Sequence, residues 1–206
     1  MADLYLASRS PRRRDLLQQI GVRFEPLLLR LVRPRGPDID EARGADEAPA
    51  AYVERVAREK VDFGVRALTM RSLRAKPVLA ADTIVVVDDD VLEKPIDAAQ
   101  AASFLRRLSG RAHDVHTAVA LGVAAGASSS LLCTTSVSTV TLRALTVDEI
   151  ARYVATSEPY DKAGGYAIQG RAAIFIERIE GSYSGVMGLP LFETAALLKR
   201  VGIAVL

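Results

Sequence analysis

Cysteine is almost absent from the sequence, because Cys133 is the only one among 206 residues. One cysteine excludes an internal disulfide framework and a cysteine-based metal site, and two histidines, His113 and His116, are too few for a three-histidine zinc site. No apolar run approaches the roughly 20 residues of a membrane helix, and residues 1–5 lack the pattern of a secretory signal. These absences predict a cytoplasmic protein with no membrane partner.

Lysine is also scarce, since 5 of the 27 basic residues are lysine and the other 22 are arginine. Arginine suits planar, bidentate binding of oxyanions, although a biased genome composition also explains most of these residues. The 25 acidic residues leave a net charge of only +2. A broad basic face is therefore not expected, and nucleic acid is not a predicted partner.

Hydrophobic periodicity and capping residues predict strands that alternate with helices. Strands are expected at residues 4–7, 22–29, 77–87, 91–93, 113–123, 131–142 and 172–179. Helices are expected at residues 12–20, 48–71 (weakened by Gly64), 98–108, 146–155 and 191–200, with loops or turns at 30–46, 124–130, 157–170 and 181–188. This order predicts one α/β domain over residues 1–206, with a mixed sheet, flanking helices and two lobes around a cleft.

The first candidate site is the turn Ser8-Arg9-Ser10-Pro11-Arg12-Arg13, between a predicted strand and a predicted helix. A helix start exposes backbone N–H groups and the positive end of the dipole. Two hydroxyls and the guanidiniums of Arg12 and Arg13 would complete a phosphate site there. A well-capped helix with solvated arginines explains the same residues.

The second candidate is Asp82, which lies in the apolar run Val-Leu-Ala-Ala-Asp-Thr-Ile-Val-Val-Val. A carboxylate is costly to bury unless it is paired or bound to a metal, so this position favours a function over a strand-end cap. Glu41 could supply a second metal ligand beside Asp82, or it could be a solvated loop acid. His113, His116 and Cys133 are interpreted as structural residues.

The third candidate is the glycine-rich segment at residues 158–170. Its glycines permit close approach of a ligand, Lys162 carries a point charge, and the Gln169 amide can read a base edge through a paired donor and acceptor. A flexible loop is the alternative interpretation. Lys60 and Lys94 have no distinctive surroundings in the sequence, and solvated lysines are the usual explanation for such positions.

Taken together and in order, these segments resemble the Maf family of nucleoside triphosphate pyrophosphatases. The resemblance is carried by residues 7–13, 40–41, 58–60, 81–83, 94–95, 108–111, 160–170, 177–183 and 188–191, and it covers essentially the whole chain. The segments Tyr-Asp-Lys-Ala-Gly-Gly-Tyr-Ala-Ile-Gln-Gly and Gly-Ser-Tyr are similar to the branch that prefers dTTP and UTP. One departure is Arg9, which stands where the family usually has glycine.

The resemblance implies a fold like that of the inosine triphosphate pyrophosphatases, a homodimer, and a divalent metal cofactor, Mg²⁺ or Mn²⁺. The implied activity is nucleotide house-cleaning: hydrolysis of a nucleoside triphosphate to the monophosphate and pyrophosphate. Asp82 matches the proton acceptor, and Arg12, Thr83 and Gln169 match positions linked to substrate specificity. The further matched active-site positions are Ser8, Arg13, Glu41, Lys60 and Lys94.

The expected mechanism places the triphosphate on the turn at residues 8–13, with Ser10 and Lys162 as additional substrate-binding residues and with Lys60 and Lys94 balancing charge. A metal held by Asp82 and Glu41 would assist the attack of water on the α-phosphorus. Two alternatives stay open at this point. One is a non-catalytic nucleotide-binding regulator of cell division, and the other is a pyrophosphatase for modified purine nucleotides.

Overall fold

A computed structural model describes residues 2–29, 39–125 and 128–205. Within these residues seven strands form one sheet in the order β2-β1-β3-β5-β6-β7, with β4 paired to β3. The strands are β1 (Leu4–Leu6), β2 (Phe24–Pro26), β3 (Val78–Val87), β4 (Asp90–Leu92), β5 (Ala112–Ala125), β6 (Ser128–Leu142) and β7 (Ile176–Glu180). β1 is parallel to β2 and β3, whereas β4 and β7 are antiparallel to their neighbours. The predicted mixed α/β sheet is therefore confirmed.

Three of the six helices in the described part of the chain begin directly after residues whose side chains cap them. The helices are α1 (Pro11–Gln19), α2 (Pro49–Met70), α3 (Ala98–Leu108), α4 (Val147–Val154), α5 (Tyr183–Met187) and α6 (Leu191–Arg200). The side chains of Ser10, Asp97 and Thr146 accept backbone N–H groups at the starts of α1, α3 and α4. Because such caps act within one turn, they can be read from the sequence alone.

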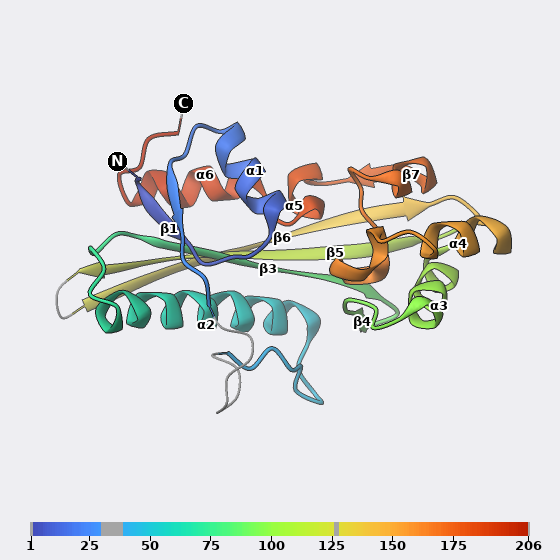
Figure 1. The fold of residues 1–206 in the computed structure, drawn as a ribbon, viewed down its shortest axis with the longest axis horizontal. Helices are drawn as coiled ribbons and strands as arrows, with labels where there is room; N and C mark the ends of the chain where they lie inside the picture. Colours follow the sequence, from blue (N-terminus) through green and yellow to red (C-terminus); the bar gives the residue numbers. More distant parts are fainter. Residues whose placement is uncertain (1, 30–38, 126–127, 206) are drawn as a thin grey trace. The chain divides into compact units, whose positions relative to one another are not determined.

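The chain divides into two compact units. Unit 1 comprises Met1–Asp82, Ala118–Thr135 and Gly188–Leu206, and unit 2 comprises Thr83–Thr117 and Ser136–Met187. Strands β3, β5 and β6 contribute residues to both units. Within unit 1, α2 covers one face of the strands, and α1 and α6 cover the other (Figure 1).

Gly64 lowers the helix propensity of α2, but it also has a packing role. A Cβ atom at this position would lie 2.8 Å from Val78 Cγ1 and 3.4 Å from Leu27 Cδ2. The missing side chain lets α2 approach β3 closely, so the loss of helix propensity is offset by packing. The sequence shows the cost of this glycine, but only the fold shows its use.

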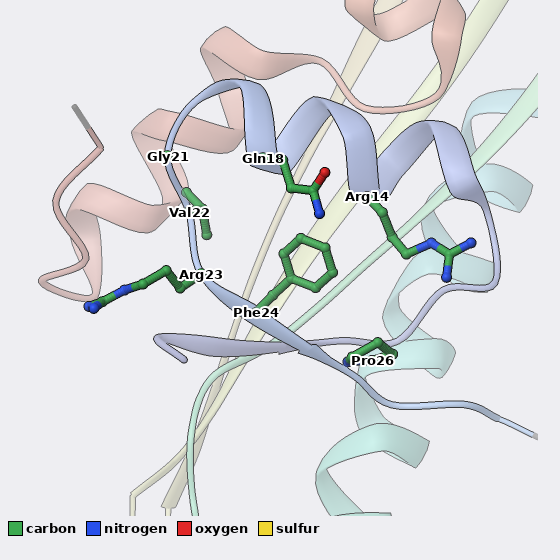
Figure 2. Close-up of a pocket in the computed structure, with 7 residues that line it drawn as sticks. All are labelled: Arg14, Gln18, Gly21, Val22, Arg23, Phe24 and Pro26. Atoms are coloured by element: carbon green, nitrogen blue, oxygen red, sulfur yellow. The ribbon is translucent and has the colours of Figure 1, made fainter. Parts of the chain in front are cut away.

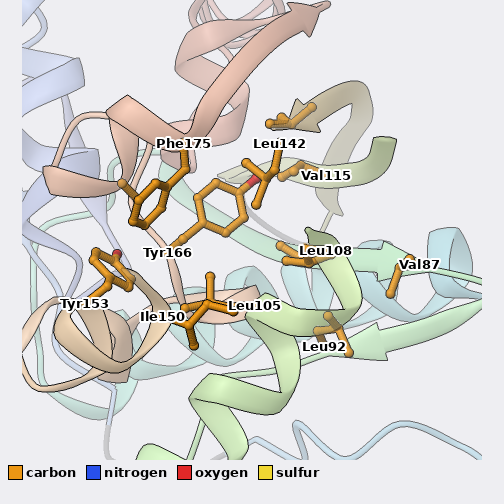
Figure 3. Close-up of a cluster of buried hydrophobic side chains, with 13 residues drawn as sticks. Val87, Leu92, Leu105, Leu108, Val115, Leu142, Ile150, Tyr153, Tyr166 and Phe175 are labelled. Atoms are coloured by element: carbon orange, nitrogen blue, oxygen red, sulfur yellow. The ribbon is translucent and has the colours of Figure 1, made fainter. Parts of the chain in front are cut away.

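Unit 2 has its own apolar core, which includes Leu92, Leu105, Leu142, Tyr166 and Phe175 (Figure 3). A buried polar pair adjoins it, because His113 Nε2 lies 2.7 Å from the Tyr166 hydroxyl oxygen. His113 is 4% exposed. The interpretation of this histidine as a structural residue fits that place.

We expect His113 to make the free energy of unfolding fall below neutral pH. Burial is the main cause that lowers the pKa of His113 from 6.5 to about 4, against the charge of Asp114. Between these values the unfolded chain binds the proton and the folded chain does not, so acid favours unfolding. From pH 7 to pH 5 the loss is about 2 kcal/mol.

Urea denaturation of wild type and of His113→Gln at pH 7 and pH 5 measures the contribution of His113 to the free energy of unfolding. The variant should lose less stability on acidification than wild type does. An identical pH dependence in the two proteins would show that His113 titrates normally.

Two predictions after residue 170 are wrong. The strand expected at 172–179 begins only at β7, because residues before it form the 3₁₀ helix η3 (Arg171–Phe175). Ala172 and Phe175 are buried while Ile174 is 72% exposed, which fits a three-residue period rather than strand alternation. The loop expected at 181–188 contains α5, whose start is stabilised by a hydrogen bond from Gly185 N–H to Ser182 Oγ (2.9 Å).

Other boundaries also differ. The strand expected at 22–29 shortens to β2, because β1 offers it only three residues for pairing. The loop expected at 157–170 contains the 3₁₀ helices η1 (Glu158–Asp161) and η2 (Ala163–Gly165), and its residues 164–168 are buried. Parts of two expected loops, residues 30–38 and 126–127, lie outside the described residues. In the described part of the chain, no helix is both long and apolar enough for a membrane span.

Candidate active site

The turn between β1 and α1 is organised by its two serines. Ser8 Oγ accepts hydrogen bonds from Ser10 N–H (3.2 Å) and from Arg13 Nη1 (3.3 Å). Ser10 Oγ caps the helix by accepting from Arg13 N–H (3.4 Å). Hydroxyls, a guanidinium and the positive end of a helix dipole therefore meet at one place in unit 1, as the phosphate-site prediction requires.

Arg13 is held from two sides. Its Nε donates to the carbonyl oxygen of Gly188 (2.7 Å), which precedes α6, while Nη1 contacts Ser8. Burial lowers the pKa of Arg13, and the charge of Arg12 lowers it further, whereas the charges of Asp82 and Glu41 raise it. The two acids therefore lie near enough to act on this guanidinium. Arg9, the departure from the family pattern, donates through Nη2 to the Leu29 carbonyl (3.0 Å).

A second cluster in unit 1 joins Asp82, Lys60 and Glu41. Lys60 Nζ on α2 lies 2.8 Å from Asp82 Oδ1 on β3 and 2.7 Å from Glu41 Oε1. The Lys60 and Asp82 side chains are 14% and 17% exposed. The carboxylate in the apolar strand is thus paired, as its burial demands. Lys60 was not distinctive in the sequence because its partner is 22 residues away.

Side chains of α2 hold the segment that carries Glu41. Arg55 donates to the carbonyl oxygens of Asp40 (Nη1, 3.2 Å) and Ala42 (Nη2, 2.8 Å), and the Tyr52 hydroxyl donates to that of Glu41 (2.7 Å). Arg55 also pairs with Glu47 at 2.7 Å. Sequence analysis missed Arg55 and Tyr52, since contacts with backbone carbonyls leave no signature in residue types.

The two carboxylates are the natural candidates for a metal site. Both contact the same ammonium nitrogen, so they lie close together. Across the described ranges, no group of three or more His, Cys, Asp or Glu side chains is placed to hold a metal ion. Mg²⁺ is commonly held by one or two carboxylates and completed by substrate phosphates and water. Asp82 and Glu41 fit that pattern of oxygen donors.

The remaining predicted site residues belong to unit 2. Thr83 follows Asp82 in β3, and its Oγ1 lies 3.0 Å from Thr117 Oγ1. Lys94 is exposed on the arm after β4, beside Glu93, whose carbonyl oxygen accepts from Gly164 N–H (3.1 Å). That backbone bond links the lysine arm to η2.

Lys162 and Gln169 differ in their surroundings. Lys162 Nζ donates to the Glu158 carbonyl oxygen (2.8 Å) and pairs with Asp161, and its side chain is 15% exposed. The structure therefore gives Lys162 partners within its own segment. Gln169 is exposed. The predicted cleft between lobes, where these residues would meet Asp82, stays a prediction.

A hollow in unit 1 is bounded by the outer side of α1 and by β2 (Figure 2). Its lining residues are Arg14, Gln18, Gly21, Val22, Arg23, Phe24 and Pro26. The predicted site residues are not among them. Arg23 forms an ion pair with Asp3 at 2.8 Å, which partly neutralises its charge. The hollow is therefore a weaker candidate for binding an anion than the turn at Arg13.

Comparisons with known proteins give matches over nearly the whole chain. The family model described as "Maf-like protein" matches residues 3–201. A protein named dTTP/UTP pyrophosphatase from Aromatoleum aromaticum is 54% identical over 202 residues, covering 98% of this chain and 96% of its own. Proteins of the same name from Nitrosomonas europaea and Cupriavidus metallidurans are 52% and 50% identical. The first match covers 98% of this chain and 96% of the relative, and the second covers 97% of each.

Proposed function

We propose that the chain, which belongs to the Maf family, is a nucleoside triphosphate pyrophosphatase acting on dTTP and UTP. One observation carries the proposal. The ion pair of Asp82 with Lys60 (2.8 Å) lies in the same unit as the serine-lined turn, where the charge of Asp82 raises the pKa of Arg13 against the lowering by burial. An acid, a phosphate-binding turn and a balancing lysine therefore occupy one region of unit 1.

The chain's own residues perform distinct tasks in the proposed reaction. Arg12, Arg13 and the start of α1 bind phosphate oxygens, and Ser8 orients Arg13. Lys60 orients the Asp82 carboxylate through the 2.8 Å contact. Asp82 then accepts a proton from the attacking water.

Bonds and charges balance in this step. The water oxygen bonds to the α-phosphorus, the bond from that phosphorus to the bridging oxygen breaks, and pyrophosphate leaves with the bridging electrons. A bound Mg²⁺ or Mn²⁺, held by Asp82 and Glu41, would supply charge neutralisation at the phosphates. The products are the nucleoside monophosphate and pyrophosphate.

The test is pyrophosphate release from a panel of dTTP, UTP, CTP, ITP, GTP and 7-methyl-GTP, with Mg²⁺, Mn²⁺ or EDTA. We expect dTTP and UTP to turn over fastest and EDTA to stop the reaction. Binding without turnover would favour the regulator of cell division. Faster turnover of ITP or 7-methyl-GTP would favour a purine-cleaning enzyme.

We also propose a cytoplasmic homodimer. The support is the family resemblance together with a composition that lacks disulfide-forming cysteine pairs. Light scattering of the purified protein measures the mass in solution. A mass of twice 22.1 kDa is the expected result, and a monomer at micromolar concentration would contradict it.

A further inference from the structure

The Glu158 carboxylate links α4 to the start of η3, the two elements that flank the segment carrying Gln169. Glu158 Oε1 accepts hydrogen bonds from the Tyr153 hydroxyl (2.8 Å) on α4 and from Ala172 N–H (3.2 Å). Glu158 Oε2 accepts from Arg171 N–H (2.9 Å). The carboxylate thus caps the start of η3 from 13 residues upstream, and the helix itself offers no side-chain cap of its own.

The neighbouring backbone is shaped to admit this carboxylate. A Cβ atom at Gly170 would lie 2.4–2.5 Å from the Glu158 carboxyl atoms, well inside contact distance. A side chain at residue 170 would therefore displace the Glu158 carboxylate from its present position. The main chain of Glu158 is held as well, since its carbonyl oxygen accepts from Lys162 Nζ (2.8 Å).

Gln169 lies on the turn that these contacts enclose. Ala167 and Ile168 are buried on its N-terminal side, and Gly170 N–H donates to the Ala167 carbonyl oxygen (3.0 Å). On its C-terminal side, Arg171 is bound by Glu158. The exposed amide therefore projects from a short turn that is fixed at both ends.

We propose that Glu158 is a positioning residue that sets the place of the Gln169 amide and thereby the enzyme's selectivity among nucleotide bases. This inference rests on the proposed function. An amide distinguishes bases only if its donor and acceptor are held in one place, because a displaced amide pairs equally poorly with every base. Glu158 supplies that constraint without touching the substrate.

A double-mutant cycle tests the coupling. Glu158→Gln keeps the shape of the side chain but replaces one acceptor oxygen with an NH₂ group that faces donors. We expect KM for dTTP and UTP to rise roughly tenfold, with a smaller change in kcat and a reduced preference for these substrates over CTP. In a Gln169→Ala background, the same change should have little further effect.

Glu149→Gln is the matched control, because Glu149 also caps a helix in unit 2, through Thr146 N–H (2.9 Å) and Arg143 (2.7 Å). It should lower stability and leave the nucleotide preference unchanged. Additive effects of Glu158→Gln and Gln169→Ala, or an equal loss of selectivity in Glu149→Gln, would overturn the proposal.

Two further measurements keep the inference separate from the proposed function. Hydrogen exchange at the amides of residues 170–172 should accelerate in Glu158→Gln, and this readout needs no turnover. If wild type hydrolyses no nucleotide, the proposed function fails while exchange still reports whether Glu158 holds the turn. If Glu158→Gln does not fold, Tyr153→Phe removes only one of the three donors, and the same cycle is run with that variant.

Discussion

Asp82→Asn is expected to lower kcat for dTTP and UTP by about 100- to 1,000-fold while the protein stays folded. Asparagine has the same shape, and its amide oxygen can still accept a hydrogen bond from Lys60, which now lies 2.8 Å from Asp82 Oδ1. It cannot take a proton from water, and it removes one negative charge from the cluster with Glu41. The measurement is the initial rate of pyrophosphate release at saturating nucleotide.

The control for this loss is Asp62→Asn. Asp62 is an exposed acid on α2, the helix that carries Lys60, so its substitution changes the net charge of unit 1 equally. Thermal unfolding of both variants establishes that they fold. Near-normal turnover in Asp82→Asn would remove Asp82 from the mechanism as the proton acceptor.

Arg13→Lys is expected to lower kcat/KM by about 100-fold, although the charge is conserved. The guanidinium uses two different nitrogens, Nε toward the Gly188 carbonyl oxygen (2.7 Å) and Nη1 toward Ser8 Oγ (3.3 Å). An ammonium group is a point charge and cannot reproduce this fork. The side chain would lose its orientation in the turn, and phosphate binding would weaken.

Arg14→Lys is the matched control because Arg14 is the next residue of α1 and is exposed at the hollow shown in Figure 2. Steady-state kinetics of the two variants, measured with the same nucleotide and metal, give the comparison. Equal effects would mean that only the general charge of α1 matters and that the contacts of Arg13 do not.

The helices with side-chain caps were the most predictable part of the fold because their signals are local. Ser10 with Pro11 at the start of α1, and Thr146 with Glu149 at the start of α4, satisfy backbone donors within one turn. The strand expected at 172–179 failed for the opposite reason. The start of η3 donates hydrogen bonds to the Glu158 carboxylate, which lies 13 and 14 residues away in the chain.

The candidate site likewise combines residues that the sequence indicated with residues that only the structure revealed. The residue types of the turn at residues 8–13 offered a phosphate site as one of two interpretations, and the isolated Asp82 favoured a function. Arg55, Tyr52 and Gly188 carried no such signal, because the first two hold carbonyls of a loop and the third contributes a carbonyl of its own. Backbone groups are present at every residue, so the sequence cannot tell which of them a side chain will meet.

Read alone, the sequence determined the starts of the capped helices and, through the ordered set of matching segments, the family, since these depend on residue types and on spacing along the chain. Only the tertiary structure decided that Lys60 pairs with both Asp82 and Glu41, that Arg13 reaches Gly188 across 175 residues, and that Glu158 accepts hydrogen bonds from Arg171 N–H and Ala172 N–H. Those contacts join segments far apart in the chain, and their partners become defined only when the strands and helices pack.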